Sequence, residues 1–188
     1  MSTPQEARAY MEKIKSILEY IDVSNCRMEE GNLRADLNIS LRPVGQKTLG
    51  TKAEMKNINS FKALEDALSY EIERQEEILD DGGHIVQETR TWDPERGVTK
   101  SMRSKEEAHD YRYMPEPDLV PIVTTEEEIE EYRRHLPELP DARRVRYMKE
   151  YGLSEYDAGI ITASRAMAEY FEACLANGAD AKSAANWM

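Results

Sequence analysis

Polar side chains suited to metal and phosphate binding follow two successive segments of the sequence, each alternating with apolar residues. In segment 33–42 the polar positions are Arg34, Asp36, Asn38, Ser40 and Arg42, and in segment 51–56 they are Lys52, Glu54 and Lys56. An alternation of period two predicts a β-strand with one apolar and one polar side. Carboxylate oxygens suit a hard divalent cation, and neighbouring cationic side chains suit phosphate oxygens. The two segments therefore have the composition of a site that holds a divalent metal beside a phosphate.

The same alternation has a simpler explanation, because an antiparallel sheet commonly exposes one polar side to water. In that case Asp36 and Glu54 pair with Arg34, Lys52 or Lys56 and carry no chemistry. Aspartate and asparagine are poor strand formers, so their presence inside the first segment favours a functional reason. Periodicity by itself leaves both interpretations open.

The elements that must position these strands begin and end at recognisable signals. Thr3 and Glu6 form a capping-box pattern, with proline in the first turn, and predict a helix that continues to Ile21. The two strands follow. Ser60 is then expected to cap a second helix, whose apolar residues are spaced by three or four and which ends at Asp81-Gly82-Gly83.

The remaining sequence predicts a hairpin and then helices. Residues 85–92 and 98–104 form the hairpin around the turn at 93–97, and three prolines predict an extended loop over 110–123. Helical patterning resumes at Thr125 and is interrupted at 137–140 and at Gly152. The expected fold is α+β, in which an antiparallel sheet with flanking helices is followed by a helical segment. A domain boundary is expected near 122–125.

Composition limits the class of protein. No apolar run among the 188 residues approaches the roughly 20 that a membrane span requires, and the first residues lack the pattern of a signal peptide. Cys26 and Cys174 are far apart and outside any CxxC pattern, which predicts reduced thiols in a cytoplasmic protein.

The charge distribution is unusual for a nucleic-acid-binding protein, because the formal net charge is −12. Acidic residues concentrate in Glu71–Asp81 and Glu126–Glu131, which are predicted to be solvent-facing helix surfaces. The basic side chains gather at Arg133, Arg134, Arg143, Arg144, Arg146 and Lys149. These basic residues either contact a nucleic-acid stem or form salt-bridged helix faces, and composition favours the second interpretation.

Seven segments of the sequence resemble, in order and spacing, the B subunit of the tRNA-dependent amidotransferases, the GatB/GatE family. They are MEEGNLRADLNISLRP, GTKAEMKNINSF, YEIERQEEIL, GGHIVQETRTWD, KEEAHDYRYMPEPDLVPI, PELPDARRVRYMKEYGLSEYDA and NGADAKSAANWM. The resemblance covers essentially the whole chain. It implies a subunit that acts with an A and a C subunit to convert Glu-tRNA(Gln) to Gln-tRNA(Gln), or Asp-tRNA(Asn) to Asn-tRNA(Asn). In this family the A subunit releases ammonia from glutamine, and the B subunit uses ATP to phosphorylate the misacylated carboxylate before amidating it.

The resemblance also implies a metal site. Asp36 and Glu54 match acidic positions that the family uses to bind Mg²⁺ where phosphorylation occurs. Glu29 and Glu30 lead into the first strand and are candidates to complete the metal shell.

The cationic and amide side chains of the same strands are assigned by chemical type and location. Arg34, Lys52 and Lys56 are expected to hold the phosphates of ATP or the developing acyl phosphate. Asn38 and Ser40, together with Asn57 and Asn59, are expected to orient the aminoacyl group or the terminal adenosine. A plain role on the sheet surface stays open for each of them.

Residues farther along the chain carry weaker signals. Glu88 and Arg90 are expected to pair across the hairpin with Arg103 and Lys105. His109 lies beside an acid but has no accompanying nucleophile, so a structural or substrate-orienting role is expected. The sequence contains neither GxxxxGK[ST] nor GxGxxG, so ATP binding by this chain would not use a P-loop.

By the same resemblance, residues 1–123 correspond to the C-terminal part of a catalytic cradle domain and residues 124–188 to the start of a helical domain. The chain is therefore expected to be a piece of a longer subunit, without the first half of the cradle and without the tail domain. Alone, such a piece is expected to be inactive. The competing interpretation is a non-catalytic module that docks on the A subunit or holds the acceptor end of tRNA.

Overall fold

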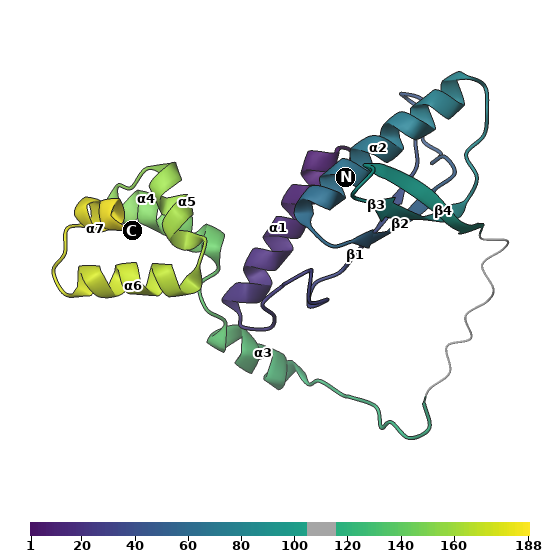
Figure 1. Cartoon of the computed structure of the whole chain (residues 1–188). Helices are drawn as coiled ribbons and strands as arrows, with labels where there is room; N and C mark the ends of the chain where they lie inside the picture. Colours follow the sequence, from purple (N-terminus) through teal and green to yellow (C-terminus); the bar gives the residue numbers. More distant parts are fainter. Residues whose placement is uncertain (105–115) are drawn as a thin grey trace. The chain divides into compact units, whose positions relative to one another are not determined.

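The computed structural model describes residues 1–104 and 116–188, which divide into two compact units (Figure 1). The first unit contains Met1–Glu12 and the described residues from 26 onward to 104, and the second contains Lys13–Asn25 and the described residues from 116. Helix α1 (Pro4–Tyr20) contributes residues to both units. The domain boundary expected near 122–125 stays a prediction.

The first helix begins where the sequence predicts. The backbone N–H of Glu6 donates to the Thr3 hydroxyl at 3.1 Å, and the Glu6 carboxylate accepts from the N–H of Ser2 at 2.6 Å. Two of the N–H groups at the start of the chain therefore have partners.

Within the described residues the first unit contains a four-stranded sheet in the order β1-β2-β3-β4. The strands are β1 (Ala35–Ile39), β2 (Ala53–Ile58), β3 (Glu88–Asp93) and β4 (Val98–Ser104). The pairs β1–β2 and β3–β4 are antiparallel, whereas β2 and β3 are parallel. The α+β class and the hairpin are confirmed, but the expectation of an antiparallel sheet is wrong for the central pair. The helix between β2 and β3 carries the chain back to the end of the sheet where β2 begins. The strand β3 therefore runs in the same direction as β2.

That helix, α2 (Phe61–Asp80), lies along one face of the sheet (Figure 1). It begins at Ser60, whose hydroxyl accepts from the N–H of Ala63 at 3.0 Å, as the sequence predicts. The apolar side of the helix packs on the apolar side of the sheet, and α1 adds to the same core. The buried residues of this core are Ala7, Met28, Met55, Ile58, Ala63, Leu64, Ala67, Leu68 and Trp92.

A polar cluster lies in the same interface, around Glu71 of α2. Glu71 is fully buried. Its carboxylate accepts hydrogen bonds from Arg74 at 2.5 Å, from Gln75 at 3.0 Å and from the hydroxyl of Thr99 on β4 at 3.0 Å. The prediction of a solvent-facing acidic surface over Glu71–Asp81 is therefore wrong for its first residue, because Glu71 points toward the sheet.

Arg90 belongs to the same cluster. It forms an ion pair with Glu88 of its own strand, and its guanidinium donates to the hydroxyl of Thr99 at 2.8 Å. Arg90 therefore contacts β4 at Thr99 and also faces Glu71 of α2. Its expected pairing with Arg103 and Lys105 stays a prediction. Lys105 and His109 lie outside the described residues.

The described residues from 116 onward are helical from Glu126, as the sequence predicts. The helices are α3 (Glu126–His135), α4 (Pro140–Tyr151), α5 (Glu155–Thr162), α6 (Arg165–Ala176) and α7 (Ala181–Trp187). Thr125 and Glu128 form a complete capping box at the start of α3. Gly152 ends α4 with a φ of 65°, a left-handed conformation that glycine adopts without strain. The core of this unit is built on the rings of Tyr147 and Phe171, whose centroids are 5.0 Å apart.

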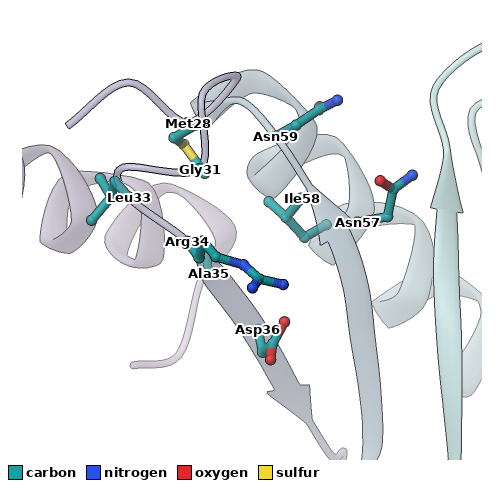
Figure 2. Close-up of a pocket in the computed structure, with 9 residues that line it drawn as sticks. All are labelled: Met28, Gly31, Leu33, Arg34, Ala35, Asp36, Asn57, Ile58 and Asn59. Atoms are coloured by element: carbon teal, nitrogen blue, oxygen red, sulfur yellow. The ribbon is translucent and has the colours of Figure 1, made fainter.

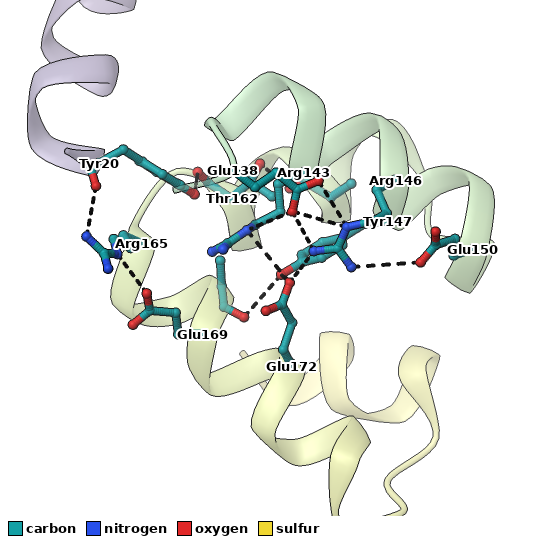
Figure 3. Close-up of polar contacts among 12 residues, drawn as sticks. Tyr20, Glu138, Arg143, Arg146, Tyr147, Glu150, Thr162, Arg165, Glu169 and Glu172 are labelled. Carbon is teal, nitrogen blue, oxygen red and sulfur yellow. Dashed lines mark hydrogen bonds and ion pairs between the residues drawn. The ribbon is translucent and has the colours of Figure 1, made fainter. Parts of the chain in front are cut away.

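Ion pairs connect α4 to its neighbours in the helical unit (Figure 3). Arg146 lies 2.6 Å from Glu138 and 2.5 Å from Glu172, and the almost completely buried Arg143 lies 3.4 Å from Glu138. The interpretation of these two arginines as salt-bridged helix residues is confirmed.

Both cysteines are thiols, as predicted. No helix in residues 1–104 or 116–188 combines the length and the apolar character that a bilayer span requires.

Candidate functional site on the sheet

The side of the sheet that faces away from α2 carries the polar residues of the strands, and we call it the polar face. Its members are Asp36 and Asn38 of β1, Glu54 and Lys56 of β2, and Thr89 of β3. The alternation of each strand produces this face, because the neighbouring residues Leu37, Met55 and Ala53 turn toward the core.

A β-bulge interrupts the pairing of β1 with β2 beside Asp36. Ala35 pairs with Ile58 and Leu37 pairs with Met55. An interval of two residues on β1 therefore matches an interval of three residues on β2. Asn57 is the extra residue on β2, and its φ is 66°. Its side-chain amide donates to the backbone oxygen of Trp92 on β3 at 3.1 Å. The bulge lets Ile58 reach the core while Asn57 stays on the surface.

A pocket of about 150 Å³ lies at the bulge (Figure 2). Figure 2 shows Arg34 and Asp36 projecting from the start of β1 beside it. The pocket is lined by Met28, Gly31, Leu33, Arg34, Ala35, Asp36, Asn57, Ile58 and Asn59. It combines an apolar part with a cation, a carboxylate and two amides, so it offers contacts to a small polar or charged group.

Glu54 is held at both of its carboxylate oxygens. Its side chain is only 15% exposed. Oε2 accepts a hydrogen bond from the hydroxyl of Thr89 at 3.1 Å, and Oε1 lies 3.6 Å from the ammonium group of Lys56. Asn38 is directly opposite Glu54 on β1. The carboxylate is therefore oriented by a neutral donor on one side and a cation on the other.

Asp36 and Glu54 are diagonal neighbours on the polar face, a relation that separates Cα atoms by roughly 7–8 Å in regular antiparallel pairs. Mg²⁺ is usually bound through one or two carboxylates, with waters and phosphate oxygens as its other ligands. The donor chemistry of this pair fits such an ion. The described residues contain no group of three or more His, Cys, Asp or Glu side chains arranged for a metal. The metal role of Asp36 and Glu54 stays a prediction.

The other predicted site residues are dispersed around this pair. Glu29 and Glu30 lie in the turn before β1 and do not line the pocket, and Glu30 pairs with Arg27 at 2.7 Å. Lys52 is exposed just before β2, and Ser40 is half-buried just after β1. The structure therefore groups Arg34 and Asp36 at the pocket and Glu54 and Lys56 beside it.

Thr89 contacts Glu54 on the polar face, and the sequence predicted no role for it. It is almost fully buried, and it is the direct partner of Glu54 in the parallel pair of β2 with β3. The 20-residue helix between the two strands could have predicted this contact. A helical crossover places the following strand parallel to the preceding one and beside it.

Comparison with known proteins assigns the chain to a protein family. The family model described as the GatB/GatE catalytic domain matches residues 1–130. Three relatives are named as the B subunit of an aspartyl/glutamyl-tRNA(Asn/Gln) amidotransferase. The chain is 59% identical to the protein of Caldanaerobacter subterraneus subsp. tengcongensis over 188 residues, 59% identical to that of Carboxydothermus hydrogenoformans over 186, and 58% identical to that of Moorella thermoacetica over 188.

These matches take in 99–100% of this chain but only 39–40% of each relative, so the chain spans about two fifths of the length of the proteins it matches. The resemblance seen in the sequence motifs is thereby confirmed. The chain belongs to the GatB/GatE catalytic domain family.

Proposed function

We propose that this chain carries part of the phosphorylation site of a tRNA-dependent amidotransferase, as a portion of its B subunit. The observation that carries the proposal is the grouping of Asp36, Glu54, Lys56 and Arg34 on and beside one face of a sheet. Two carboxylates can hold a metal ion and two cationic side chains can bind phosphate oxygens. These groups suit phosphoryl transfer, because its catalysis consists mainly of positioning and charge stabilisation. The names of the relatives support the same reaction class.

The reaction activates a carboxylate, which is otherwise a poor electrophile. An oxygen of the misacylated glutamyl or aspartyl side chain attacks the γ-phosphorus of ATP, forming an O–P bond while the bond to ADP breaks. Ammonia then attacks the carbonyl carbon of the acyl phosphate, the nitrogen loses a proton, and inorganic phosphate leaves. The product is Gln-tRNA(Gln) or Asn-tRNA(Asn).

Each residue of the site has a role in this scheme. Asp36 and Glu54 would hold Mg²⁺, which when bound neutralises phosphate charge. Arg34, Lys52 and Lys56 neutralise the oxygens of the transferred phosphoryl group. Asn38 and Ser40 orient ATP or the aminoacyl end of the tRNA by hydrogen bonds.

The partners follow from the same scheme. Ammonia is supplied by a glutaminase, the A subunit, in a complex that also contains the C subunit. The substrate is misacylated tRNA(Gln) or tRNA(Asn), and the complex works in the cytoplasm. Because the chain is acidic overall, its own contact with tRNA would come from a small number of local cations, with other contacts from the rest of the B subunit and from the partner subunits.

The test uses the complete three-subunit enzyme with Asp36→Ala or Glu54→Ala. We expect transfer of the γ-phosphate of ATP to misacylated tRNA to be lost, while glutamine hydrolysis by the partner subunit continues. Glu76→Ala, at an exposed position of α2, is the matched control and should phosphorylate normally. Normal phosphorylation by both Asp36→Ala and Glu54→Ala would remove these carboxylates from the site and refute the proposal.

A further inference from the structure

The hydroxyl of Thr89 is placed to act on the site through Glu54. Thr89 is 2% exposed, and its hydroxyl donates to Oε2 of Glu54 at 3.1 Å. The two residues are direct partners in the parallel pair of β2 with β3, so the contact joins adjacent strands of one sheet. A donor on a neighbouring strand is held more rigidly than a donor on a loop.

The contact gives the two carboxylate oxygens of Glu54 different hydrogen-bonding surroundings. Oε2 is turned toward the neighbouring strand by Thr89, and Oε1 is left on the side of Lys56 at 3.6 Å. Threonine is β-branched and has few χ1 rotamers, which limits the positions that its hydroxyl oxygen can take.

We infer that Thr89 is a positioning residue, which holds the Glu54 carboxylate in the orientation that binds a divalent cation on the polar face. The inference rests on the proposed function, because it assigns Thr89 a task at the same site. Burial alone does not account for Thr89, since valine has nearly the same shape and would fill the space without a polar group.

The experiment measures Mn²⁺ binding to the complete three-subunit enzyme by water-proton relaxation, in the wild type and in Thr89→Val and Thr89→Ser. Loss of a residue that orients a metal ligand typically weakens metal binding by about 10–100-fold, and we expect Thr89→Val to fall in this range. Thr89→Ser keeps the hydroxyl and should bind nearly as the wild type does. Thr91→Val is the matched control, because Thr91 lies on the same strand and pairs with Lys56 instead of Glu54.

A double-mutant cycle with Glu54→Gln separates positioning from a general effect on the fold. If Thr89 acts through Glu54, Thr89→Val should weaken Mn²⁺ binding in the wild-type background and add nothing in the Glu54→Gln background. Urea unfolding of each variant identifies any loss of folded protein, and Thr89→Ala, which also removes the hydroxyl, supplies the second variant should Thr89→Val unfold.

The outcomes separate this inference from the proposed function. Wild-type affinity in Thr89→Val, with weakened binding in Glu54→Gln, overturns the role of Thr89 and leaves the metal site in place. A Thr89→Val effect that persists undiminished in Glu54→Gln also overturns it. Binding that Glu54→Gln leaves unchanged, or no binding by the wild type, removes the metal assignment itself and this inference with it.

Discussion

At the scale of single residues, Asn57 connects the core of the sheet to the candidate pocket. Its φ of 66° lies in the left-handed region, where asparagine is tolerated better than most residues with a side chain. Its amide hydrogen bond to the Trp92 backbone oxygen ties β2 to β3 at the bulge. Both features hold Ile58 in the core while Asn57 and Asn59 line the pocket.

Substitution of Asn57 separates backbone strain from the hydrogen bond. Asn57→Ala loses the bond and places an alanine in the left-handed region, and together these should lower the free energy of unfolding by about 1–3 kcal/mol. Asn57→Gly loses the bond without the strain and should fall between alanine and the wild type. Urea denaturation measures all three. Equal stability of the alanine and glycine variants would show that the conformation contributes nothing.

At the scale of elements, α2 serves both as the crossover that makes β2 and β3 parallel and as the carrier of a buried carboxylate. Burial by itself raises the pKa of Glu71, but the hydrogen bonds from Arg74, Gln75 and Thr99 outweigh it and lower the pKa below its ordinary value. A carboxyl group whose pKa is lowered by folding stabilises the folded state when it is ionised. This stabilisation is complete at pH values above the ordinary pKa and is lost as the pH falls through the lowered one.

The pH dependence of stability therefore tests the cluster around Glu71. We expect the free energy of unfolding of the wild type to decrease as the pH falls below the ordinary carboxyl value of 4.5. Glu71→Gln should decrease less over the same interval, because an amide does not titrate there. At neutral pH it should be less stable by roughly 1–3 kcal/mol, since Arg74 loses the carboxylate it pairs with and Arg90 keeps only Glu88.

Glu76→Gln is the control for this measurement, because Glu76 is on the same helix but exposed. Chemical denaturation between pH 3 and pH 7 should give a curve for Glu76→Gln that is parallel to the wild type. A Glu71→Gln curve that is also parallel to the wild type would exclude a pKa lowered by folding at Glu71.

At the scale of the whole molecule, the described residues form two units with separate hydrophobic cores. One core lies between α2 and the sheet, and the other is built around Tyr147 and Phe171 among the helices. Arg143 and Arg146 belong to the second unit and are engaged with Glu138 and Glu172. These two arginines therefore stabilise the helical unit, and their charges are already balanced within it.

Phe171→Ala should destabilise the helical unit alone. Phe171 is fully buried against the rings of Tyr147 and Tyr151, and removing such a ring costs about 3–5 kcal/mol. Hydrogen exchange should accelerate in α4, α5 and α6, while the amides of β2 and α2 keep their protection. Tyr170→Ala, at the neighbouring exposed position, should change little. Loss of protection in both units would show that they unfold as one.

The sequence by itself determined the features that depend on a few neighbouring residues. Thr3, Ser60 and Thr125 begin helices because their hydroxyls accept backbone N–H groups three positions on. The alternation around Asp36 and Glu54 determined which side chains share a face, because the period of a strand is two. The family motifs, which are also local, identified the chain as a member of the GatB/GatE catalytic domain family.

Only the tertiary structure decided how these elements combine. The parallel pairing of β2 with β3 joins residues that are 35 positions apart, such as Glu54 and Thr89, and no local pattern determines that register. The bulge at Asn57 depends on the fit between two strands. Glu71 is buried although the acidic residues that follow it on the same helix, Glu73, Glu76 and Glu77, are exposed. The difference arises because Arg74, Gln75 and Thr99 donate hydrogen bonds to Glu71. In each case the deciding free energy comes from contacts that exist only after the chain has folded.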